Sequence, residues 1–83
     1  MRATLRLRLD EIAKYRVRAG LRTEQDLADA MRASQATVNR VLNGRQQPGP
    51  EFIASLVSSL EKQGATFYDL FEIAPEDEEE TAA

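Results

Sequence analysis

The sequence contains no cysteine and no histidine among its 83 residues. The absence of cysteine excludes a disulfide framework and a thiolate metal site, and it fits a reducing compartment such as the cytoplasm. The absence of histidine removes the commonest general base of enzymes and the commonest zinc ligand. We therefore expect the protein to use neither a metal nor a cofactor.

Aromatic side chains and long apolar runs are also scarce. Two tyrosines, three phenylalanines and no tryptophan, within a hydrophobic content of 42%, allow one small domain with a modest core but no large enclosed active site. No apolar run is as long as a membrane span, and the N-terminus lacks the apolar segment of a signal peptide. Ser58 and Ser59 have no evident base to activate them. We expect a cytoplasmic protein that is not an enzyme.

Charge is divided unevenly along the chain. Residues 1–50 hold ten basic and five acidic residues, a net charge of +5, whereas residues 51–83 hold one basic and nine acidic residues, a net charge of −8. The division indicates a basic binding half, although charged residues also simply solvate a surface. Residues 75–83 have no apolar anchor and predict a disordered acidic tail. Such a tail either aids solubility or competes with a nucleic acid for the basic half.

Thr23 to Arg45 predicts two short helices joined by a tight turn. The first covers residues 24–31 after Thr23 as N-cap, and the second covers residues 35–42 after Ser34 as N-cap. Each helix carries one apolar stripe at helical spacing: Leu27, Ala28 and Met31, then Val38, Val41 and Leu42. The two helices can therefore share a core. The second helix would expose a polar face made of Gln35, Ala36, Asn39 and Arg40.

Three further helices are expected around this pair. Residues 10–19 predict the first, with Asp10 as N-cap and with Ile12, Ala13 and Val17 facing inward. Residues 50–63 predict the fourth, with Pro50 in its first turn. Residues 67–73 predict a short fifth helix capped by Thr66. The inward stripes of the last two helices are Phe52, Ile53, Leu56, Val57 and Leu60, then Phe67, Leu70 and Phe71.

Residues 1–9 alternate leucine and arginine at Leu5, Arg6, Leu7, Arg8 and Leu9, which is the period of a strand with one apolar face. A single strand needs a partner for its backbone groups. Three arrangements are open for this segment. It forms a disordered arm, it extends the first helix, or it pairs with the same strand of a second subunit.

The order and spacing of Leu27-Ala28, the short turn, residues 34–40 and Asn43-Gly44-Arg45 are similar to the helix-turn-helix of the lambda-repressor/Cro-like (XRE-type) DNA-binding family. The likeness covers about residues 9–73. The resemblance implies an all-α, compact five-helix domain over residues 10–74, preceded by an arm or strand at 1–9. In similar proteins the fifth-helix end carries a dimer contact, for which Tyr68 and Ile73 are the candidates.

On this interpretation the helix at 35–42 enters the major groove of double-stranded DNA. Arg40 would read a guanine, Gln35 and Asn39 adenine edges, and Ala36 a thymine methyl group. Phosphates would be contacted by backbone N–H groups near Thr23 and near Asn43-Gly44-Arg45, and by side chains. The predicted phosphate-contacting residues are Thr23, Thr37, Asn43, Arg45, Gln46, Gln47 and Arg16. We expect a homodimer on a palindromic operator.

Three positions depart from the pattern of the family. Glu24 stands where members commonly have a glutamine that contacts a phosphate, so its carboxylate must turn aside or serve the capping. Arg32 stands where the turn usually has glycine. Leu42 replaces a glutamate that pairs with the arginine of the first helix, which would leave Arg16 freer to meet DNA.

The leading hypothesis is a bacterial or phage-encoded transcriptional regulator, most simply a repressor of the phage-immunity or Cro-like type. A second hypothesis is the antitoxin of a toxin–antitoxin pair, whose strand-like N-terminus or acidic tail binds a toxin while the helix-turn-helix regulates the operon. A third is a protein-interaction module that has lost DNA binding. Salt-dependent binding to duplex DNA separates the third from the other two.

Overall fold

The computed structural model describes residues 3–75, and the predicted acidic tail lies almost wholly outside them. In chain order the elements are β1 (Ala3–Leu7), α1 (Leu9–Ala19), α2 (Glu24–Met31), α3 (Gln35–Leu42), α4 (Pro50–Leu60), a 3₁₀ turn η1 (Glu61–Gln63), α5 (Phe67–Leu70) and β2 (Phe71–Pro75). The predicted bounds of α2 and α3 are confirmed. Helix α4 begins at Pro50 as predicted, and its last predicted turn is the 3₁₀ segment.

The starts of α2 and α3 are set by short polar side chains. Thr23 Oγ1 accepts a hydrogen bond from the Asp26 N–H at 3.0 Å, and Asp26 Oδ2 accepts from the Thr23 N–H at 3.3 Å. Ser34 Oγ accepts from the Thr37 N–H at 3.1 Å. These contacts satisfy N–H groups that a helix start leaves without partners. The prediction of Asp10 as a cap is wrong, because α1 begins at Leu9 and Asp10 lies in its first turn.

The core is a single apolar cluster shared by all five helices and β2. Its large members Leu27, Val38, Leu56 and Leu70 have no exposed surface. Most of the predicted inward stripes are confirmed, with Leu42, Ile53, Val57 and Phe67 partly buried at the edge of the cluster. The full buried set is Ile12, Leu27, Ala28, Met31, Val38, Val41, Phe52, Leu56, Leu60, Ala65, Leu70 and Phe71.

The prediction for the inner face of α1 is partly wrong. Ile12 is buried as expected, but Ala13 is exposed and Val17 is 77% exposed. Helix α1 instead turns Tyr15 and Ala19 toward the core, three and seven residues after Ile12. This spacing continues the stripe that starts at Ile12, whereas Ala13 and Val17 lie on the neighbouring stripe.

The largest correction concerns the two ends of the described chain. The fifth helix stops at Leu70, not at residue 73, and Phe71 takes an extended conformation with φ −133° and ψ 151°. β2 then pairs antiparallel with β1, from Ala3 opposite Pro75 to Leu7 opposite Phe71. The N-terminal segment is therefore a strand, but its partner belongs to the same chain. The fold is mainly helical with a two-stranded sheet, so the all-α prediction is incomplete.

The reason for this error is visible in the pattern of residues 67–73. Phe67, Leu70 and Phe71 fit a helical stripe, yet Phe71 is equally well buried as the first residue of a strand. β1 supplies the partner that makes the strand the better choice, with Leu5 and Leu7 packed against the core. The Arg8 N–H continues the pairing by donating to the Leu70 carbonyl at 2.8 Å.

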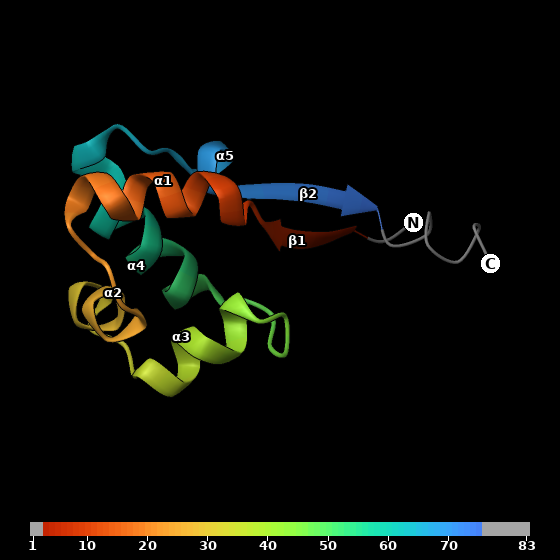
Figure 1. Ribbon diagram of the computed structural model, residues 1–83. Helices are drawn as coiled ribbons and strands as arrows, with labels where there is room; N and C mark the ends of the chain where they lie inside the picture. Colours follow the sequence, from red (N-terminus) through yellow and green to blue (C-terminus); the bar gives the residue numbers. More distant parts are fainter. Residues whose placement is uncertain (1–2, 76–83) are drawn as a thin grey trace.

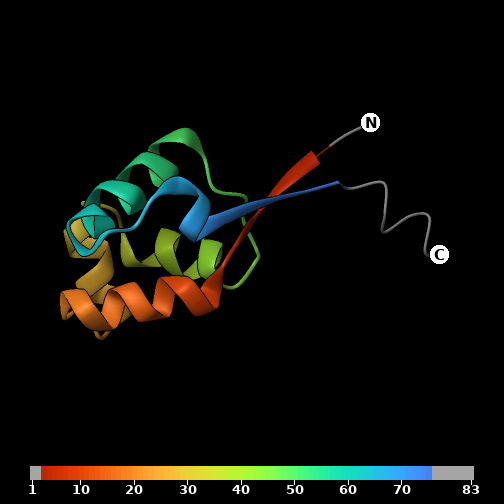
Figure 2. The same ribbon diagram turned by 90° about the horizontal axis from the view of Figure 1, so that it is seen from above.

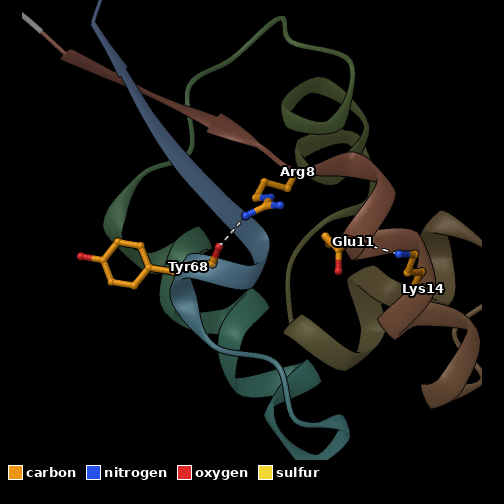
Figure 3. Close-up of polar contacts among 4 residues, drawn as sticks. All are labelled: Arg8, Glu11, Lys14 and Tyr68. Atoms are coloured by element: carbon orange, nitrogen blue, oxygen red, sulfur yellow. Dashed lines mark hydrogen bonds and ion pairs between the residues drawn. The ribbon is translucent and has the colours of Figure 1, made fainter.

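The strands form a ribbon that extends from the helical body beside the start of α1 (Figures 1 and 2). In Figure 1, α5 lies at the top, the ribbon extends to the right from the start of α1, and α3 lies at the bottom. Figure 3 shows the junction of α1 with α5, where Arg8 Nη1 donates to the Tyr68 carbonyl at 3.3 Å. The Tyr68 ring points away from the body and is 71% exposed, and Ile73 is 59% exposed.

Candidate nucleic-acid interface

The four predicted base-contacting residues share the outer side of α3. Val38 and Val41 face the core and are buried, and the helical period of 3.6 residues places the four predicted residues on the side away from them. Gln35, Ala36 and Arg40 are exposed, and Asn39 is half-buried. The structure thus brings these four residues together on one helix face. Their contacts with bases remain predictions.

Arg40 is held by two neutral side chains. Its Nε–H donates to Gln46 Oε1 at 2.9 Å, and Nη2 donates to Thr37 Oγ1 at 3.3 Å. The Ser34 hydroxyl donates in turn to Thr37 Oγ1 at 2.8 Å. A guanidinium group carries five N–H donors, so both hydrogens on Nη1 and one on Nη2 stay available. These free N–H groups can donate side by side to two adjacent acceptors. The sequence did not predict that Gln46 holds the Arg40 side chain in this position.

Asn39 is held from the neighbouring helix. Its Nδ2 donates to Glu24 Oε1 at 3.0 Å, and both side chains are partly buried between α2 and α3. Glu24 therefore turns aside as expected for a carboxylate at this position. It plays no part in the cap of α2, which Thr23 and Asp26 complete by themselves.

The loop after α3 exposes three of the predicted phosphate-contacting side chains, Arg45, Gln46 and Gln47. The backbone around it differs from our expectation. The N–H groups of Asn43, Gly44 and Arg45 donate to α3 carbonyls at 3.0, 3.1 and 2.8 Å. They close the C-terminal end of α3 and are not free for phosphates, because helix ends satisfy their carbonyls in this way. Asn43 Nδ2 also donates to the Asn39 carbonyl, at 2.9 Å.

Arg16 is less free than its missing glutamate partner suggested. Its Nε–H donates to the Leu21 carbonyl and its Nη2 to the Arg22 carbonyl, both at 3.2 Å. The side chain is half-buried and ties the α1–α2 loop to α1. These carbonyls replace the carboxylate that Leu42 does not provide. A phosphate contact by Arg16 remains a prediction. It would use the guanidinium N–H groups that do not donate to the loop carbonyls.

A family model of the helix-turn-helix domain matches residues 9–66. The chain belongs to this helix-turn-helix domain family. A search of curated proteins and a search of solved structures each found no match. The matched residues run from the start of α1 to the residue before α5, so both strands of the ribbon lie outside them. Membership makes DNA the expected partner and DNA-binding regulation the expected role, in a family that is typically non-enzymatic.

Within residues 3–75, no cluster of acidic side chains could hold a metal ion. No helix in that same range is both long and apolar enough to span a bilayer.

The acidic side chains of α2 accept hydrogen bonds from neutral groups within the helix-turn-helix. Asp26 accepts from the Thr23 N–H, and Asp29 Oδ1 accepts from Gln25 Nε2 at 2.8 Å. Glu24 is engaged by Asn39. Each carboxylate of α2 thus has a neutral donor within the pair of helices, and Arg40 forms no ion pair within residues 3–75. Its full positive charge remains available to a ligand.

The turn between α2 and α3 places Arg32 in the left-handed region, with φ 59° and ψ 41°. It is the only residue other than glycine with positive φ among the described residues. Its N–H donates to the Asp29 carbonyl at 3.2 Å, which ends α2. The turn therefore keeps the shape that glycine usually provides, at a conformational cost to arginine.

Proposed function

We propose that this protein is a sequence-specific, double-stranded DNA-binding transcriptional regulator of the lambda-repressor/Cro-like (XRE) type, acting as a repressor in the cytoplasm. Helix α3 lies in the major groove and reads bases, while α2 crosses the phosphate backbone. One domain covers half of an operator, so a homodimer binds a palindrome whose half-sites are about one helical turn apart.

The observation that carries the proposal is the shared outer face of α3. Gln35, Ala36, Asn39 and Arg40 turn to the same side of a helix whose opposite side is buried. Glutamine and asparagine suit adenine edges, arginine suits guanine O6 and N7, and an alanine methyl group suits a thymine methyl group. Such a set of groups on an exposed helix favours recognition of a duplex over catalysis.

Affinity comes mainly from phosphates, as in other DNA-binding proteins. Arg45, Gln46 and Gln47 stand exposed in the loop that follows α3. Thr23 caps the start of α2, Thr37 lies in the first turn of α3, and Asn43 follows the last residue of α3, so each stands near a helix end that would face the phosphate backbone. Side chains rather than the N–H groups of residues 43–45 make these contacts, because those N–H groups already have partners.

Selection of bound sequences from random duplexes tests the proposal. We expect the recovered sequences to share a palindrome, and Arg40→Ala to relax the preference at one position per half-site by roughly 5- to 150-fold. Arg45→Ala should weaken binding to all sequences alike and reduce the salt slope by about one. Lys62→Ala, which removes the same charge from the exposed η1 turn, is the matched control and should change neither.

A second candidate function is that of an antitoxin. It is supported by the ribbon, which lies outside the helix-turn-helix match, and by the exposure of Tyr68 and Ile73 beside it. In that case the ribbon side binds a toxin while α3 binds the operon. Co-purification with a small basic protein, abolished by replacing Tyr68 and Ile73 with serine, would favour this function over a free-standing repressor.

A further inference from the structure

We propose that Glu24 is a positioning residue that determines which base Asn39 selects. This inference rests on the proposed DNA-reading function of α3 and assigns a role to a residue outside α3. Glu24 stands at the first position of α2, and Asn39 stands in the middle of α3. Their side chains meet across the two helices through the 3.0 Å hydrogen bond from Asn39 Nδ2 to Glu24 Oε1.

The chemistry of the pair fixes the orientation of the amide. A carboxylate only accepts hydrogen bonds, so the NH₂ end of Asn39 must face Glu24 and Oδ1 must face away. A glutamine at position 24 could accept or donate, and it would therefore allow either orientation of the Asn39 amide. Glu24 thus selects one of two orientations that would present different groups to a base.

The selected orientation still leaves Asn39 able to read a base. The amide nitrogen has two hydrogens, and donation of one to Glu24 leaves the other together with Oδ1. One donor beside one acceptor is what the N7 and N6 groups of adenine require. The bond to a charged acceptor is stronger than a neutral one, so it holds the amide against rotation before DNA arrives.

No other contact within residues 3–75 explains the carboxylate. The cap of α2 is formed by Thr23 and Asp26 alone, and Glu24 has no ion pair there. A negative charge near DNA weakens binding to phosphates, which is a cost shared by all sequences. The start of a helix lowers the cost of placing that charge within the protein. The contact that distinguishes Glu24 is therefore its bond to Asn39, which orients the Asn39 amide.

Base-preference profiles of three variants test this role against a purely electrostatic one. We expect Glu24→Gln to raise affinity for all duplexes and also to reduce, by about 5-fold or more, the preference at the single position read by Asn39. Glu24→Asp keeps the charge but shortens the side chain, so it should relax that position without the general gain. Asp29→Asn, which removes a charge on the same helix, should give the general gain alone.

A double-mutant cycle shows whether Glu24 changes base preference through Asn39. In an Asn39→Ala background, Glu24→Gln should change affinity for all sequences equally and leave the profile unaltered. In the free wild-type protein, the side-chain amide resonances of Asn39 should be shifted relative to those in Glu24→Gln and Glu24→Asp. Thermal unfolding followed by circular dichroism establishes that each variant is folded, and Glu24→Asp provides the test should Glu24→Gln unfold.

Three outcomes of these experiments can be distinguished. A relaxed position in Glu24→Gln and Glu24→Asp that disappears without Asn39 establishes the positioning role. Identical profiles for wild type, Glu24→Gln and Glu24→Asp overturn it while leaving the proposed function intact. Failure of the folded wild-type protein to bind any duplex at low salt overturns the proposed function, and this inference with it.

Discussion

The polar face of α3 and the β1–β2 ribbon are held in place by different kinds of contact. Within and after α3, residues close in sequence support one another, as when Gln46 accepts from Arg40 and Ser34 donates to Thr37. The ribbon joins the two ends of the described chain, with Ala3 opposite Pro75. The polar face of α3 thus depends on local contacts and on one bond to α2, from Asn39 to Glu24. The ribbon depends on backbone pairing and apolar packing between distant segments.

The difference also separates what each region can do. Exposed donors and acceptors on α3 suit a polar ligand, whereas Tyr68 and Ile73 expose apolar surface on the ribbon side. Exposed apolar side chains suit contact with a protein better than contact with DNA. The comparison therefore predicts that substitutions at the ribbon change stability or association, and that substitutions on α3 change DNA binding.

The largest expected effect comes from the residue that joins the ribbon to the core. Phe71 is fully buried and stacks on Phe67 with ring centroids 5.2 Å apart. We expect Phe71→Ala to reduce the free energy of unfolding by about 3–5 kcal/mol, measured by urea denaturation. Ile73→Ala, two residues along the same strand but 59% exposed, is the control and should cost about 1 kcal/mol or less. Equal losses would show that the ribbon is not anchored through Phe71.

A smaller effect is expected from the cap of α2. Thr23→Ala removes the hydroxyl that accepts from the Asp26 N–H, and it should cost about 0.5–2 kcal/mol of stability. Ser58→Ala, on the exposed side of α4, removes a hydroxyl that caps nothing and should be nearly neutral. Thermal unfolding of both variants measures the difference. An unchanged midpoint for Thr23→Ala would contradict the role of the cap.

Arg32→Gly should act in the opposite direction. Arginine is strained at φ 59°, whereas glycine adopts this conformation readily, so we expect a gain of up to about 1 kcal/mol. The gain is limited because glycine also increases the freedom of the unfolded chain. Arg18→Gly, within α1, should instead lose about 1 kcal/mol. Chemical denaturation of the pair tests the turn geometry, and a loss at both positions would argue against it.

The smallest effect is a dependence of stability on acid at α5. The N–H and hydroxyl of Thr66 donate to Asp69 at 2.9 and 3.0 Å and lower the pKa of its carboxyl, with a further contribution from the charge of Arg8. A lowered folded-state pKa gives stability that is present above the ordinary value of 3.8 and is lost as pH falls through the folded-state value. As the pH is lowered from about 5, the free energy of unfolding of wild type should therefore fall further than that of Asp69→Asn. Parallel unfolding curves would contradict this role of Asp69.

Much of the helical body could be predicted from the sequence because its signals are local. Thr23 and Ser34 are caps by residue type, and the stripes of α2 and α3 repeat at helical spacing, so their bounds agree with the structure. The resemblance to a DNA-binding family agrees with the helix-turn-helix match over residues 9–66. The ribbon could not be predicted in this way. A strand alternation at residues 5–9 does not identify its partner, and Phe71 suits a helix or a strand equally.

The site shows the same limit. Residue type and position placed Gln35, Ala36, Asn39 and Arg40 on the outer face of α3, where they lie. The sequence did not indicate which side chains hold them, because the Glu24–Asn39 contact depends on how α2 packs against α3. It also did not reveal that the N–H groups of residues 43–45 are used within the protein. Their closure of α3 depends on the path that the chain takes after Leu42.

Base reading by α3 is tested most directly by measuring binding to an operator in which one base atom has been replaced. In the selected operator, 7-deazaguanine at the guanine assigned to Arg40 removes the N7 acceptor and leaves the base pair intact. We expect wild type to lose about 10-fold or more in affinity, as for a hydrogen bond to a charged group, and Arg40→Ala to lose nothing further. Equal losses for wild type and Arg40→Ala, or no loss with 7-deazaguanine at any position, would contradict base reading by α3.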